Sequence, residues 1–69
     1  MLKVGMLVRV IYPEYAAGMK GFLLAREVLA QRWIVQLVEN LIDNSDQPFL
    51  LSLEESDFEV IDLDEEEGV

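Results

Sequence analysis

The fold of this chain depends on one stretch, residues 22–39, which read FLLAREVLAQRWIVQLVE. Two apolar runs lie on either side of residues 30 and 31. In the second run, Trp33, Val35 and Leu37 fall on one face of an extended chain. Aromatic and β-branched residues favour strands, and the alternation has the period of two that is typical of a half-buried strand. The stretch therefore predicts a β-hairpin.

A single helix over residues 22–42 is the alternative. This segment is rich in Leu, Ala, Arg, Glu and Gln, and it contains no Gly or Pro. On a helix, four polar residues between positions 32 and 43 would form one arc, but Leu29 and Trp33 would lie beside that arc and blur it. The hairpin is the better supported of the two structures.

Three further segments outside the hairpin have strand character. Residues 6–12 alternate and are ended by a proline, while residues 49–53 and 58–62 are short apolar or alternating runs. Residues 13–21 are a loop that includes one helical turn, and residues 53–57 have the composition of a helical or 3₁₀ turn. The sequence therefore predicts an all-β chain of about five strands.

The same alternation predicts which side chains lie inside. We expect one domain over residues 1–61, followed by an acidic, disordered tail at 62–69, because the tail has too few apolar residues to order itself. Trp33 is expected to be partly buried. The outer face is expected to carry Leu7, Ile11, Ile34 and Val38. The expected core consists of Val8, Val10, Leu23, Val35, Leu37, Leu51, Leu53, Phe58 and Val60.

The spacing of glycines and aliphatic residues along the chain resembles that of SH3-like small β-barrels. The motifs that carry this resemblance are Gly5-x-x-Val8-x-Val10, Gly18-x-x-Gly21-x-Leu23, Val35-x-Leu37, Leu51-x-Leu53-Glu54 and Phe58-x-Val60. The first two motifs resemble the opening of KOW-type modules in ribosomal and transcription-elongation proteins. The order of segments is also similar to that of the SH3-like accessory subunits of cyanobacterial photosynthetic complexes.

This resemblance implies a single SH3-like five-stranded small barrel with a short helical turn before the last strand. In both groups of proteins, binding relies on basic residues, of which this chain has only five. We therefore transfer no functional residue from either group.

The charge of the chain is concentrated at one end. The formal net charge is −9. Residues 1–52 contain five basic and five acidic residues, whereas residues 53–69 contain nine acidic residues and no basic one. Such acidic runs usually keep a chain soluble, but this one also has the charge to engage a basic partner or the basic half of its own chain. The folded body is expected to be close to neutral.

The residue types present argue against catalysis. The chain has no Cys and no His, so it lacks a thiolate nucleophile and the commonest general base and metal ligands. Its serines have no His to activate them. The acidic residues lie in a charge run and a polar loop, and residues 43–46 do not have the spacing of a calcium loop. We expect a chain that is not an enzyme and has no catalytic residue, metal site, cofactor or small-molecule substrate.

Protein interaction is the function that the sequence favours. Small barrels leave a groove between the first loop, which here contains Tyr12, Glu14 and Tyr15, and the loop after the third strand, which here is residues 40–48. Ile34 and Val38 are expected on the outer face, where a partner or a second copy would cover them. We therefore predict a non-catalytic protein-interaction or accessory module that docks onto a larger assembly. Its partner would be another protein or a second copy of the chain. Its partner-binding residues would be these five.

A KOW-like module that contacts RNA or a ribonucleoprotein is the alternative. Lys3, Arg9, Lys20, Arg26 and Arg32 would form its basic patch. Nucleic acid is nevertheless disfavoured, because a chain of net charge −9 repels phosphate. No apolar run reaches the roughly 18 residues that span a bilayer, and no targeting signal is recognised, so we expect a cytoplasmic protein without membrane insertion.

Overall fold

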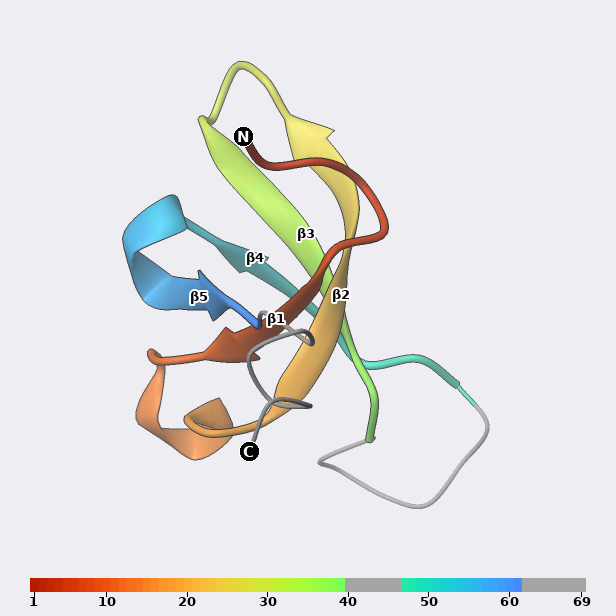
Figure 1. The fold of residues 1–69 in the computed structure, drawn as a ribbon, viewed down its shortest axis with the longest axis vertical. Helices are drawn as coiled ribbons and strands as arrows, with labels where there is room; N and C mark the ends of the chain where they lie inside the picture. The colour runs from red at the N-terminus through yellow and green to blue at the C-terminus, as the bar shows by residue number, and fades with distance from the viewer. Residues whose placement is uncertain (40–46, 62–69) are drawn as a thin grey trace, which may run out of the picture.

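The computed structural model describes residues 1–39 and 47–61. They form one five-stranded antiparallel sheet in the order β4-β3-β2-β1-β5 (Figure 1). The strands are Leu7–Val10 (β1), Lys20–Glu27 (β2), Arg32–Leu37 (β3), Leu50–Leu53 (β4) and Phe58–Val60 (β5). Two single turns of 3₁₀ helix, Glu14–Ala16 (η1) and Glu55–Asp57 (η2), follow β1 and precede β5. The predicted all-β class and the helical turn before the last strand are confirmed.

The hairpin predicted for the deciding stretch is β2–β3, and the helical alternative is wrong. The two strands pair from Gly21↔Leu37 to Glu27↔Arg32, with one irregularity between Leu23 and Ala25. Buried residues alternate with half-buried ones along β3, which is the period of a strand and not of a helix. The hairpin forms because its apolar residues reach the core only in this alternating arrangement.

The sheet is strongly curved (Figure 1). β2 begins beside β1 and continues beside β3, and Figure 1 shows it bending between them. Within the described residues no pairing joins β4 to β5, so these are the two edge strands. An open antiparallel sheet is therefore what the described residues establish.

The core lies on the inner face of the curved sheet. Eight of the nine predicted core residues are buried, and Trp33 is only 4% exposed, so it is buried more fully than predicted. The prediction for Val60 is wrong, because this side chain is 41% exposed. It pairs with Val8 at the end of edge strand β5, where no strand covers its other side. Ala16 and Ile61 are also buried, although neither was among the predicted core residues.

The turn before β5 is fastened to the end of β1. Within the turn, the backbone N–H of Glu54 donates to Oδ2 of Asp57 at 3.1 Å. The carbonyl oxygen of Asp57 accepts hydrogen bonds from the N–H groups of Ile11 and Tyr12 at 2.8 and 3.1 Å. This junction holds the start of the first loop beside η2 and so positions the groove described next.

Candidate functional site

A groove of about 290 Å³ runs between β4 and the first loop. We call it the tyrosine groove. One wall is the edge of β4, and the other comes from the first loop and η2. Its lining residues are Tyr12, Pro13, Tyr15, Arg32, Leu50, Leu51, Ser52, Leu53 and Asp57.

The first loop presents its tyrosines on a fixed frame. Pro13 follows β1 and has no N–H to extend the ladder. Ala16 in η1 is fully buried and anchors the turn in the core. Tyr12 and Tyr15, which both precede this anchor in the chain, stay 61% and 65% exposed. Exposed tyrosine rings combine a large apolar surface with a polar hydroxyl, which is typical of protein interfaces.

The charges around the groove are mostly negative. Asp57 lines it, and the exposed Glu14 lies between the two tyrosines in the chain. Arg32 is the one basic residue in the lining. Its guanidinium donates to Ser52 at both the hydroxyl, 2.9 Å from Nε, and the carbonyl, 2.7 Å from Nη2. It also lies 3.5 Å from Glu54, so its charge is already compensated.

The predicted site residues fall into two separate groups. Tyr12 and Tyr15 line the tyrosine groove, and Glu14 lies between them in the chain in η1. Ile34 is half-buried on the outer face of β3, and Val38 is 59% exposed just beyond it. Both point outward as predicted, but neither lines this groove. The predicted second wall of the groove, at residues 40–48, lies mostly outside the described residues.

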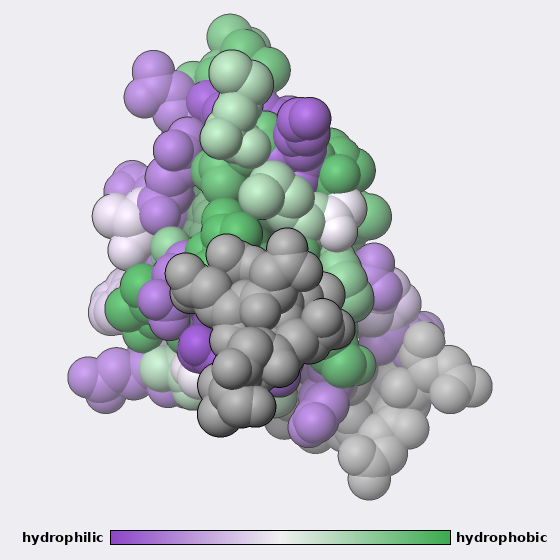
Figure 2. All heavy atoms as spheres, in the orientation of Figure 1, coloured by the Kyte–Doolittle hydropathy of each residue, from purple (hydrophilic) through white to green (hydrophobic). Residues whose placement is uncertain are grey.

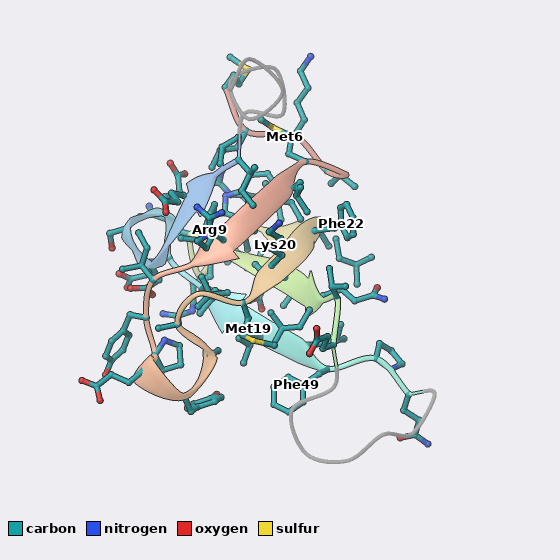
Figure 3. The ribbon with its side chains drawn as sticks, turned by 60° about the horizontal axis from the view of Figure 1, so that its bottom comes forward. Met6, Arg9, Met19, Lys20, Phe22 and Phe49 are labelled. Carbon is teal, nitrogen blue, oxygen red and sulfur yellow. The ribbon has the colours of Figure 1, made fainter. Side chains whose placement is uncertain are left out.

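Val38 lines a different cavity at the end of the sheet. This cavity measures about 300 Å³ and is also lined by Gly18, Met19, Lys20 and Glu39. Figure 3 shows Met19 and Phe49 at this end of the structure, and both side chains are half-buried against the core. The cavity is therefore the rim of the core and is distinct from the tyrosine groove.

The predicted basic patch is largely compensated by acidic residues from the end of the described chain. Arg9 lies 3.6 Å from Glu59, and Arg26 lies 3.7 Å from Glu55. Together with the pair at Arg32, glutamates of residues 54–59 thus meet arginines on three strands. Arg9 and Lys20 lie side by side on β1 and β2 (Figure 3).

Trp33 is not accessible for stacking on a nucleic-acid base. Its ring is buried, and the guanidinium carbon of Arg26 lies 5.1 Å from the ring centroid, which is a cation–π contact. Its Nε1 group is buried without a hydrogen-bond partner. Trp33 is therefore part of the core. The aromatic side chains that the first loop exposes are those of Tyr12 and Tyr15.

We expect these ion pairs to suppress binding to polyanions. Replacing Glu54, Glu55 and Glu59 together by Gln removes three acidic charges and the ion pairs that they form with the three arginines. The variant should bind single-stranded polyuridylate more tightly, with a salt dependence that steepens by about 0.7 per arginine that gains a phosphate contact. Fluorescence anisotropy over a range of salt concentrations measures this slope.

A matched control changes the net charge by the same amount elsewhere. In this control Glu65, Glu66 and Glu67 are replaced together by Gln, so the two variants carry identical net charge. Identical polyuridylate binding by both variants would contradict the prediction, because it would assign the effect to net charge alone.

Comparison with known proteins adds no family to this description. No protein-family model matches the chain, and no curated protein is significantly similar to it. Among residues 1–39 and 47–61, no helix has the length and apolar character needed to cross a membrane.

Proposed function

We propose that this chain is a non-catalytic interaction module that docks onto a protein partner through the tyrosine groove. The observation that carries the proposal is the position of two tyrosines, each more than 60% exposed, beside the edge of β4. Tyrosine is enriched among the residues that contribute most to binding energy in protein interfaces. The hydrogen bonds from Ile11 and Tyr12 to Asp57 fix the start of the first loop in the free chain. The loop therefore loses little conformational entropy when a partner binds.

We further propose that the fold is an SH3-like small barrel. The strand order, the long first loop and the 3₁₀ turn before β5 support this assignment. The KOW-like alternative has less support, since glutamates compensate the three arginines that would contact phosphate. The module would act as an accessory part of a larger assembly.

The docking surface can be tested against a second exposed apolar region. Figure 2 shows apolar surface in the upper part of the view, where the N-terminus and the β2–β3 turn lie. Val28 and Leu29 in this turn are 72% and 101% exposed. Replacing both by Ala removes apolar surface far from the groove, and so provides a matched control for the double variant in which Tyr12 and Tyr15 are replaced by Ala.

The experiment is affinity capture on the full chain, with and without nuclease, followed by quantitative mass spectrometry. We expect a defined set of proteins whose recovery falls by a factor of about ten or more on the tyrosine variant, which corresponds to roughly 1.4 kcal/mol or more. Recovery should be unchanged on the turn variant and after nuclease treatment. Loss of recovery after nuclease would support RNA contact instead. Loss on the turn variant alone would move the interface to the β2–β3 turn.

A further inference from the structure

The outer edge of β4 carries backbone groups that no described strand pairs. The N–H of Leu37 donates to the carbonyl of Phe49 at 2.9 Å, which defines one hydrogen-bonded pair of the β3–β4 ladder. The pair Val35↔Leu51 lies two residues further along and is of the same kind. The intervening Leu50 and Ser52 therefore direct their N–H and C=O groups away from β3. Of these groups, the carbonyl of Ser52 accepts a bond from Arg32.

The tyrosine groove runs along this same edge. All four residues of β4 line it. Consecutive side chains of a strand point to opposite faces, so a cavity that touches all four lies beside the backbone and not over one face. The first loop and Asp57 form the opposite wall. A chain in the groove would therefore have the edge of β4 on one side and the tyrosine rings on the other.

We propose that the groove binds an extended, basic segment of the partner, which pairs with β4 as an additional strand. This inference rests on the proposed function and specifies the conformation and charge of the bound segment. Strand addition uses main-chain hydrogen bonds for affinity, and it reads alternate side chains for specificity. The N–H groups of Leu50 and Ser52 are the donors that β4 offers.

The charge of the groove selects a basic segment. Asp57 lines the groove, Glu14 lies between the two groove tyrosines in the chain, and the charge of Arg32 is compensated by Glu54. The chain as a whole carries −9. A Lys or Arg on the bound segment is attracted by these carboxylates, whereas a Glu at the same position is repelled.

The test uses a short probe peptide and two variants of one residue. The probe is the capped hexapeptide Lys-Val-Lys-Val-Lys-Val, and binding to the full chain is followed by ¹⁵N NMR and by amide hydrogen exchange. Leu50→Pro removes the outward N–H without removing a ladder bond, because proline is tolerated on the open side of an edge strand. Leu50→Val keeps that N–H and is the matched control.

We expect the probe to slow exchange of the Leu50 and Ser52 amides at saturation by a factor of about ten or more. Leu50→Pro should weaken binding by about tenfold, and Leu50→Val should bind like the unmodified chain. A second probe, methylated at all of its backbone nitrogens, has no N–H group on either edge for pairing and leaves the protein unchanged. Its failure to bind supports strand addition even if Leu50→Pro does not fold.

Three results would overturn the inference. If the methylated probe and Leu50→Pro both bind normally, the groove does not act by strand addition, although docking at the tyrosines stands. If the hexapeptide Glu-Val-Glu-Val-Glu-Val binds equally well, the groove does not select basic segments. If the basic probe does not bind, or binds with no change at the tyrosines or at β4, the site is not the tyrosine groove. Only the affinity-capture experiment decides the proposed function itself.

Discussion

Replacing Leu23 by Ala is expected to lower the free energy of unfolding by about 2–5 kcal/mol, the usual range for truncating a buried leucine. Leu23 is 1% exposed and lies opposite the fully buried Val35 in the centre of the sheet. Truncation removes apolar contacts and leaves a cavity that this hydrogen-bonded region closes only in part. A chain of this size has roughly 3–10 kcal/mol of stability in total, so much of it would be lost.

The neighbouring Leu24 is the matched control for this prediction. Leu24 is 45% exposed and lies at the irregularity between Leu23 and Ala25. Leu24→Ala should change the stability by only about 0.5 kcal/mol, as is usual for exposed positions. Urea unfolding can be followed through the fluorescence of Trp33, the single tryptophan. Equal losses for the two variants would contradict the burial described for β2.

Replacing Gly21 by Ala is expected to lower the free energy of unfolding by about 1–3 kcal/mol, as overpacking a core usually does. A Cβ atom at this position would lie 2.7 Å from the carbonyl oxygen of Gln36 and 2.8 Å from Cγ1 of Val35. The first of these atoms belongs to the backbone of the central β2–β3 pair, so it moves only if the ladder shifts. The clash is therefore not relieved by rotating a side chain.

The sign of the stability change distinguishes this clash from the usual effect of replacing Gly by Ala. Where the backbone allows it, replacing Gly by Ala stabilises a protein by about 0.4–1 kcal/mol, because the unfolded chain becomes less flexible. Lys20→Ala, at the adjacent exposed position, is the control and should be nearly neutral. A Gly21→Ala variant as stable as the unmodified chain in urea would show that the strands separate easily at this point.

The fold was predictable where it depends on local alternation. Trp33, Val35 and Leu37 alternate with polar or half-buried neighbours, and this pattern alone distinguishes the strand from the helix. Val60 was mispredicted because alternation identifies the face of a strand but not whether a neighbour covers it. Ile61 was missed because it follows the end of β5, where the period of two no longer applies. Its burial depends on the sheet as a whole.

The candidate site was predictable only in its first loop. Tyr12 and Tyr15 stand out in the sequence because aromatic residues cluster beside a proline. The contribution of β4 was not accessible, because a strand becomes an edge only through the order of all five strands. The pairing of Arg9 with Glu59 joins residues 50 positions apart in the chain, and no local signal marks such a pair.

The pairing of β1 with β5 also has a consequence for folding during synthesis. β1 lies between β2 and β5, and the residues opposite Val8, Arg9 and Val10 are Val60, Glu59 and Phe58. During synthesis, β1 through β4 therefore emerge before the strand that completes them. Until residue 60 is available, β1 presents an open edge that can pair with another nascent chain. Arg9 keeps a charge on that edge throughout, and such a charge discourages pairing between chains.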